Sequence, residues 1–259
     1  MAMPKLLHSA LGLDSQVARV MLAEKDVSHR SIQASVCRPP RSIRAQLNRL
    51  RADADLPVLL RGDDVAVGVV EIAERLDLSG AGRRPHPVDE ETTRTVDAWT
   101  TLVDAFPEWE IEIGLRRRSG GRTPSDLDRL QAHLRRVEGL IEGLDRQIRG
   151  RTFVSGVEWS VADAIWTAML ARLKSLGLDE LFDSERRPAV CAYYERLRAR
   201  PSFKTARVWD RRPSLLELAA LCFRTKIDAR RLPSLIDASL PHAATTAAAS
   251  AQHAKGSRQ

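Results

Sequence analysis

Short apolar runs alternate with helical spacings over the first 78 residues. Runs of four to six mostly apolar residues predict buried strands, and apolar residues three or four apart predict helices with one buried face. In chain order the predicted elements are residues 4–9 (strand), 15–25 (helix), 31–36 (strand), 41–50 (helix), 56–60 and 65–67 (strands) and 69–76 (helix). The pattern is therefore β-α-β-α-β-β-α.

Local signals support this order. Asp14 or Ser15 offers a side-chain oxygen that can cap the first helix. Gly62 and Asp63 separate the last two strands and predict a hairpin turn. Pro57 opens the third strand, where a proline removes no interior ladder hydrogen bond.

The second part of the chain is predicted to be helical. Residues 79–88 (SGAGRRPHPV) hold two glycines and two prolines and predict a linker. A long helix is expected from about residue 124 to Gly150, with one apolar stripe formed by Leu127, Leu130, Leu134, Val137, Ile141, Leu144 and Ile148. Residues 215–223 (LLELAALCF) predict a further helix docked on the bundle, and the small, polar composition from residue 242 onward predicts disorder.

Composition narrows the class of protein. The 259 residues carry a net charge of +7, but the arginines are interleaved with acidic residues and lack alternating aromatic side chains, so a solvated surface is favoured over a nucleic-acid site. No apolar run is long enough to span a membrane, and the histidine spacing predicts no metal site. Three widely spaced cysteines suit a reducing compartment, so we expect a cytoplasmic protein.

Two pairs of segments resemble the glutathione transferase superfamily. The first pair is LLHSALGLDSQVARVMLAEKDV and ADLPVLLRGDD, which look like the strand, active-site loop, helix and cis-proline of that superfamily. The second pair is FVSGVEWSVADAIWTAMLARLKSLGL and YYERLRARPSF. Ser160 and Asp163 form a capping box there, and Arg200–Phe203 looks like the turn that ends the domain. The role of this capping box is structural.

The branch that looks most similar contains bacterial tetrachlorohydroquinone reductive dehalogenases and ganglioside-induced differentiation-associated proteins, with residues 99–107 adding to the likeness. The resemblance implies an α/β thioredoxin-like N-terminal domain followed by an all-α C-terminal domain. The corresponding division is residues 1–78, a linker at 79–88, a helical domain at 89–212, a C-terminal helical extension at 213–240 and a disordered tail at 241–259.

Glutathione chemistry needs groups that activate a thiol. Free glutathione is a weak nucleophile because its thiol is mostly protonated at neutral pH. The resemblance implies a Ser, Cys or Tyr in the first loop, which donates a hydrogen bond to the thiolate at a helix N-terminus. Here Gly12 stands at the position of the catalytic serine, and Asp14 at the reactive cysteine of the dehalogenases. A carboxylate near a thiolate raises the pKa of the thiol, which opposes activation.

The binding positions implied by the resemblance are also altered. The family holds the tripeptide with the backbone beside the cis-proline and with a Glu/Gln-Ser pair that opens the third helix. Leu56 and Pro57 supply the first position, whereas Val69 replaces the serine and has no hydroxyl. Leu56, Pro57 and Val69 are therefore the expected glutathione-binding positions. Glu71 is close to the lost pair, but we expect it to be an exposed helix residue.

Substitute catalytic groups are few. Ser15 and Ser9 are the candidate hydroxyls, although a helix cap and a loop hydroxyl are the simpler interpretations. Cys37 is the only cysteine of the first domain, and no Cys-x-x-Cys motif accompanies it, which argues against thioredoxin-type exchange.

Three functions remain open from the sequence. The first is a glutathione-dependent transferase or reductive dehalogenase with an atypical site, with glutathione as co-substrate and no metal. The second is a non-catalytic binding or interaction protein that has lost the thiol-activating residue. The third, a membrane-associated adaptor, rests on residues 215–223 alone. The family resemblance implies a homodimer, and a small hydrophobic or electrophilic ligand fits either of the first two functions.

Overall fold

The fold was obtained as a computed structural model that describes residues 3–78 and 124–240. The predicted linker at 79–88, the start of the helical domain at 89, the segment 99–107 and the tail at 241–259 lie outside the described residues. The first described part contains β1 (Lys5–Ser9), α1 (Leu13–Glu24), β2 (Arg30–Ser35), α2 (Arg41–Leu47), β3 (Val58–Arg61), β4 (Asp64–Val67) and α3 (Gly68–Leu78). The second contains α6 (Pro124–Ile148), α7 (Val161–Ser175), the 3-10 turn η2 (Asp179–Phe182), α8 (Pro188–Ala199), α9 (Pro201–Thr205) and α10 (Leu215–Asp237).

The β-α-β-α-β-β-α order predicted for the first part is confirmed. Its four strands form one mixed sheet in the order β2-β1-β3-β4. β1 runs parallel to β2 with Leu7 opposite Ile32, and antiparallel to β3 with Leu6 opposite Leu59. β3 and β4 form the predicted hairpin, in which Gly62 has a φ of 61° that suits glycine. This is a thioredoxin-like sheet.

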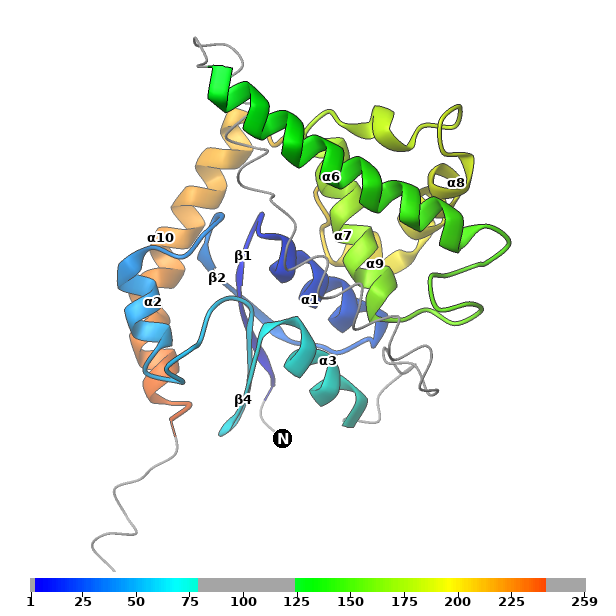
Figure 1. Ribbon diagram of the computed structural model, residues 1–259. Coiled ribbons are helices and arrows are strands. Elements are labelled where there is room, and N and C mark those ends of the chain that lie inside the picture. Colours follow the sequence, from blue (N-terminus) through cyan, green and yellow to red (C-terminus); the bar gives the residue numbers. More distant parts are fainter. Residues whose placement is uncertain (1–2, 79–123, 241–259) are drawn as a thin grey trace, which may run out of the picture.

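Neighbouring residues of β1 serve two different cores. Leu6 joins the core that α1 and α3 share with the helical domain, whereas Leu7 joins a second core beneath α2 and α10. Figure 1 shows this layering, with α1 and α3 on one side of the sheet and α2 and α10 on the other. The helical part of the chain, α6 to α9, lies against α1, so the whole is a glutathione-transferase-like fold.

The capping box predicted at the start of α7 is confirmed and is fully buried. The carboxylate of Asp163 accepts hydrogen bonds from the backbone N–H of Ser160 (2.8 Å), the backbone N–H of Val154 (3.0 Å) and the hydroxyl of Tyr193 (2.7 Å). Burial raises the pKa of the Asp163 carboxyl, and these donors act in the opposite direction. Asp163 therefore fixes the positions of α7, α8 and the loop before α7 together.

The turn at Arg200 joins the two parts of the chain. Arg200 forms a bidentate ion pair with Glu24 at the end of α1, with both N–O distances at 2.6 Å. The hydroxyl of Ser202 donates to the same carboxylate. The charged pair is partly buried, and bidentate geometry makes it stronger than a surface ion pair. The segment that carries the family resemblance thus holds the helical part against α1.

α10 lies within the helical extension expected at residues 213–240, and it continues to Asp237, beyond the apolar run that ends at Phe223. Its expected packing partner was wrong, because it packs on β2 and α2 rather than on the helical bundle. Leu232 and Ile236 are buried against the second core. The error arose because the apolar residues that the sequence analysis used lie at the other end of the helix.

We predict that Asp163→Ala lowers the free energy of unfolding by about 3 kcal/mol or more, because several buried donors would lose their acceptor together. Tyr193→Phe removes one donor and leaves the others bonded, so its expected cost is about 1 kcal/mol. Chemical unfolding followed by circular dichroism measures both variants. Equal losses for the two variants would contradict the role given to Asp163.

Candidate functional site

The loop between β1 and α1 is the place where the resemblance implies a thiol-activating residue. α1 begins at Leu13 with Gly12 as its N-cap, and no side chain caps it. The prediction that Asp14 or Ser15 caps this helix is wrong, because both residues lie inside its first turn. Asp14 is exposed, whereas Ser15 is buried. The helix N-terminus therefore presents backbone groups, with no cap hydroxyl beside them.

Ser9 is buried at the end of β1. Its hydroxyl lies 2.6 Å from the hydroxyl of Ser35 at the end of β2, and Ser9 is only 3% exposed. Ser35 in turn donates to the backbone oxygen of Cys37 at 3.3 Å. Ser9 thus belongs to a chain of buried hydrogen bonds that joins two neighbouring strand ends.

Ser15 faces the same loop from the helix side. Its hydroxyl oxygen accepts a hydrogen bond from the backbone N–H of Ser9 at 2.9 Å, and its exposure is 2%. The structure therefore brings the two candidate hydroxyl residues together. It does so in a buried hydrogen-bond arrangement that fixes the loop.

At Gly12 the backbone passes close to Ser9 and to Cys37. A Cβ atom at this position would lie 2.9 Å from the Cβ of Ser9 and 3.4 Å from the backbone oxygen of Cys37. Contacts below 3.0 Å require something to move, and the Cβ of Ser9 is fixed by its strand. The glycine is thus required by packing, and a serine cannot be placed here without a shift of β1.

A buried arginine supports this loop from behind. Arg19 of α1 donates from Nη1 to the backbone oxygen of Ser9, from Nη2 to that of Ala10 and from Nε to that of Ala206, each at 3.0 Å. Burial lowers the pKa of Arg19 to about 10, so it stays charged at neutral pH. The periodicity of α1 gave no sign that this cation is buried.

His8 completes the support. Its Nδ1 lies 3.1 Å from Nη1 of Arg19, and its Nε2 lies 2.7 Å from the hydroxyl of Ser31. A neutral ring that accepts at Nδ1 from Arg19 and donates from Nε2 satisfies these two contacts. Nδ1 also lies 3.0 Å from the backbone oxygen of Ser9, to which the other neutral tautomer would donate. Burial, reinforced by the positive charge of Arg19, lowers the pKa of His8 to about 3.

The second part of the expected site surrounds a cis peptide bond between Leu56 and Pro57, as predicted. The backbone N–H of Leu56 donates to the side chain of Asp55 at 2.8 Å. The backbone oxygen of Pro57 accepts from the N–H of Gly68 at 2.9 Å. The backbone donor that the resemblance implied for glutathione therefore already has a partner within the chain.

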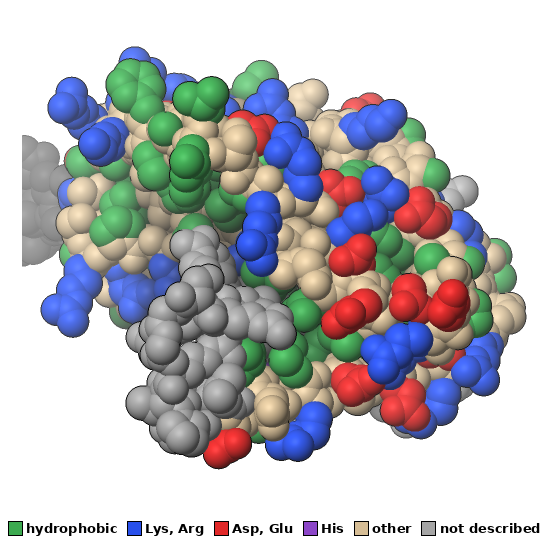
Figure 2. Space-filling model, turned by 90° about the horizontal axis from the view of Figure 1, so that it is seen from above, with side chains coloured by type: hydrophobic (Ala, Val, Ile, Leu, Met, Phe, Trp, Pro, Cys, Tyr) green, Lys and Arg blue, Asp and Glu red, His purple; other side chains and the backbone are tan. Residues whose placement is uncertain are grey.

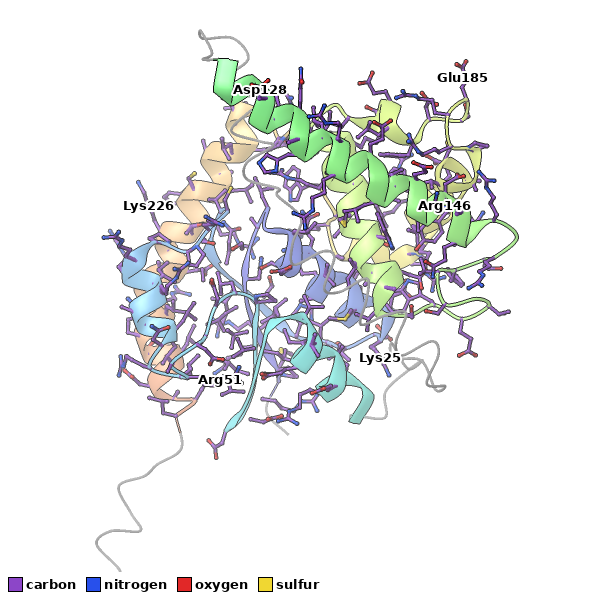
Figure 3. All side chains as sticks on the ribbon, in the orientation of Figure 1. Lys25, Arg51, Asp128, Arg146, Glu185 and Lys226 are labelled. Carbon is purple, nitrogen blue, oxygen red and sulfur yellow. The ribbon has the colours of Figure 1, made fainter. Side chains whose placement is uncertain are left out.

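The start of α3 carries an anionic side chain of its own. Val69 is half-buried and packs against the main core. Glu71 accepts from the backbone N–H of Val67 at 3.0 Å and pairs with Arg51 at 2.8 Å. Arg51 also binds Asp53 at 2.6 Å, and Figure 3 labels it on the loop before β3. The expectation that Glu71 is an exposed, uninvolved helix residue is wrong.

The described residues also line a cavity of about 700 Å³ at the other side of the β1–α1 loop. Its walls come from α1, β2, the segment after α9 and α10, and include Arg19, Arg207, Trp209, Leu221 and Arg224. None of Ser9, Ser15, Leu56, Pro57 and Val69 is among the described residues that line it. Sequence reasoning missed this cavity because its walls meet only after α10 packs beside β2.

Within the described ranges, no group of three or more His, Cys, Asp or Glu side chains is placed to hold a metal ion. The helices described here include none that is both long and apolar enough to cross a membrane. Cys37, Cys191 and Cys222 form no disulfide with one another.

We predict that Gly12→Ala lowers the free energy of unfolding by about 1–3 kcal/mol, because the new Cβ overlaps Ser9. Ser9→Gly should recover part of that loss in the double variant. Gly139→Ala is the matched control, since nothing lies within 4 Å of its new Cβ and alanine favours a helix interior. A loss at residue 139 as large as at residue 12 would contradict the close approach.

A second prediction concerns pH. The pKa of His8 is about 3 in the folded protein and near 6.5 when unfolded, so the unfolded state binds more protons between these values. Stability from neutral His8 is complete above about pH 6.5 and falls as the pH drops. From about pH 7 to about pH 5 the expected loss is about 2 kcal/mol.

His8→Gln should remove this part of the acid sensitivity, as measured by urea unfolding at the two pH values. His133→Gln on α6 is the control, because His133 is not among the groups that act on the pKa of His8, and it should keep the wild-type pH dependence. An unchanged pH dependence in His8→Gln would show that His8 is not held neutral.

Comparison with known proteins agrees with this architecture. Residues 120–196 match the family described as glutathione S-transferase, C-terminal domain. A tetrachloro-p-hydroquinone reductive dehalogenase of Sphingobium chlorophenolicum is 40% identical over 115 residues, which cover 44% of this chain and 37% of that protein. The chain therefore aligns with little more than a third of that enzyme.

Two further proteins are similar over a longer stretch. Glutathione S-transferase TCHQD of Arabidopsis thaliana is 24% identical over 238 residues, covering 77% of this chain and 88% of that one. A glutathione S-transferase of Methylobacillus flagellatus, solved with glutathione bound, superposes with a TM-score of 0.64 at 22% identity, covering 78% of this chain and 98% of the other. With the observed fold, these similarities show that the chain has a glutathione-transferase-like fold and that its C-terminal half resembles the C-terminal domain of that family, with sequence similarity to the reductive dehalogenase and to the TCHQD transferase.

Proposed function

We propose that this protein is a glutathione-transferase-like binding protein that does not activate glutathione. The observation that carries the proposal is the burial of the two candidate hydroxyl residues. Ser9 and Ser15 are 3% and 2% exposed, and both take part in buried hydrogen bonds of the β1–α1 loop. A thiolate at the N-terminus of α1 would find neither hydroxyl at the surface.

The requirements of thiol activation support this proposal. Thiol activation depends on a donor that stabilises the thiolate more than the thiol. Gly12 contributes no side chain, and its contact with Ser9 excludes the simplest replacement. Asp14 is exposed in the first turn, where its negative charge opposes thiolate formation. The helix dipole remains, but it favours a thiolate only modestly.

The arrangement around Val69 supports the same function. The resemblance implies that a serine here binds the γ-glutamyl carboxylate of glutathione. In this chain the carboxylate of Glu71 binds the N–H of Val67 and the guanidinium of Arg51. A glutathione carboxylate entering this region would meet a like charge and a cation that already has two partners.

The cavity between α1, β2 and α10 supplies a different place for a ligand. Its arginines and the ring of Trp209 suit a small molecule with an apolar body and an electronegative group. This agrees with the small hydrophobic or electrophilic ligand expected from the sequence. The homodimer implied by the family resemblance and the reducing, cytoplasmic setting expected from three widely spaced cysteines belong to the same proposal.

A glutathione-dependent reaction is the second candidate. It is favoured by the 40% identity to the reductive dehalogenase over 115 residues and by the cis bond before Pro57. It requires the β1–α1 loop to rearrange so that Ser9 or Ser15 reaches the surface.

Glutathione at about 5 mM should leave the midpoint of thermal unfolding unchanged, because the proposed protein does not hold glutathione at this site. A ligand present at 100 times its dissociation constant would add about 2.7 kcal/mol to the free energy of unfolding and raise the midpoint visibly. Conjugation of glutathione to a chlorinated aromatic acceptor should not exceed the rate without protein. A catalytically active glutathione transferase assayed in parallel shows that the reagents work.

Three variants sharpen the test. Val69→Ser combined with Glu71→Gln restores the hydroxyl and removes the competing charge, so glutathione binding should become measurable while turnover stays absent. Brisk conjugation by the wild type that is lost in Ser9→Ala or Ser15→Ala would overturn the proposal in favour of the enzyme. Light scattering at micromolar concentration tests the dimer independently.

A further inference from the structure

α10 presents a second apolar face that nothing in the described part of the chain covers. Leu215, Leu216 and Phe223 are 86%, 84% and 67% exposed, and Ile227 is 39% exposed. Monomeric proteins rarely display large side chains of this kind next to one another, and such a patch usually marks an interaction site.

The spacing of these residues places them on one side of the helix. Leu216, Phe223 and Ile227 follow each other at intervals of seven and four residues, with the exposed Ala219 and Ala220 between them. Leu232 and Ile236, which anchor α10 in the second core, lie on the opposite side. The helix therefore has one apolar face toward the protein and one toward solvent.

Cations border the outer face. Arg224 and Arg231 lie on one side of the stripe, Lys226 on the other and Arg230 at its C-terminal end, and all four are exposed. Asp228 lies 3.9 Å from Arg224, which is a long and weak ion pair. Figure 2 looks onto the end of the molecule where α10 begins, and it shows hydrophobic side chains gathered at the upper left with Lys and Arg beside them.

The helix is held rigidly in this position. Nε2 of Gln33 in β2 donates to the backbone oxygen of Leu221 at 2.7 Å and to the hydroxyl of Thr225 at 2.5 Å, and the N–H of Gln33 donates to Asp228 at 3.1 Å. The outer face is thus already helical before it meets a partner, so binding needs no further folding of this segment.

We propose that the outer face of α10 docks on the surface of an anionic lipid bilayer. An amphipathic helix with large apolar side chains on one face and cations at its borders lies in the plane of the interface, with the apolar face among the headgroups and upper acyl chains. The cations are attracted by anionic headgroups. This mode of binding needs no membrane-spanning helix.

The charges argue against a second copy of the chain on this face. A symmetric pair would bring Arg224, Lys226, Arg230 and Arg231 of one chain against the same residues of the other. Like charges at an interface are unfavourable, whereas an anionic surface is complementary to them.

The test is co-sedimentation of the full chain with large vesicles. Vesicles with about 30% phosphatidylserine in phosphatidylcholine should carry the protein down, and vesicles of phosphatidylcholine alone should carry much less. Raising the salt concentration should weaken binding because it screens the cations.

Two double variants separate the contributions. Leu216→Ser with Phe223→Ser should weaken binding more than tenfold, because the large side chains no longer enter the interface. Lys226→Gln with Arg230→Gln should weaken it by about fivefold for each cation removed. All four residues are exposed, so the midpoint of thermal unfolding should stay within the range of the wild type.

Arg136→Gln with Arg146→Gln is the matched control. It removes two exposed cations from α6, and Figure 3 shows Arg146 and Lys226 on opposite sides of the molecule. Binding should match that of the wild type. Absence of binding to phosphatidylserine vesicles, or equal loss in the control, would overturn the proposal. So would a concentration-dependent dimer that Phe223→Ser dissolves, because a second copy would then cover this face.

Discussion

The position of Arg19 is the constraint on which the site and the joint between the two parts of the chain depend. Its guanidinium is buried and donates hydrogen bonds to the backbone oxygens of Ser9, Ala10 and Ala206 and to the ring of His8. Ser9 and Ala10 belong to the β1–α1 loop, and Ala206 follows α9 in the helical part. None of the partners described for it is a carboxylate, so backbone dipoles must compensate a buried charge. That compensation is possible only while the loop and the helical part keep this geometry.

Several features of the site follow from this anchoring. The loop is held close to α1, which leaves no room for a side chain at Gly12. The hydroxyls of Ser9 and Ser15 form hydrogen bonds that stabilise the same loop. His8 is kept neutral by burial and by the adjacent cation. At the other end of the expected site, Glu71 and Arg51 satisfy each other. The residues at these positions therefore make internal contacts that stabilise the fold.

α10 changes what the sheet exposes. β2 is an edge strand, and an uncovered edge offers unpaired backbone groups to other chains. Asp228 accepts from the backbone N–H of Gln33, and Leu232 and Ile236 cover the second core beneath α2. The same packing forms one wall of the cavity and turns Leu216 and Phe223 outward. α10 therefore covers the edge strand β2, forms one wall of the cavity and displays an apolar face.

The sequence by itself determined the order of elements in the first part, the long α6 stripe, the Ser160–Asp163 capping box and the position of the cis bond before Pro57. These are local features, encoded by spacing, by turn residues or by a resemblance carried in short segments. Only the tertiary structure decided that Ser9 and Ser15 share one buried arrangement, that Glu71 pairs with Arg51 and that Gly12 lies against Ser9. It also decided where α10 packs, since an apolar stripe specifies a face to be buried without naming its partner. Pairings between residues distant in the chain leave no periodic pattern in the sequence, and the geometry of the candidate site depends on them.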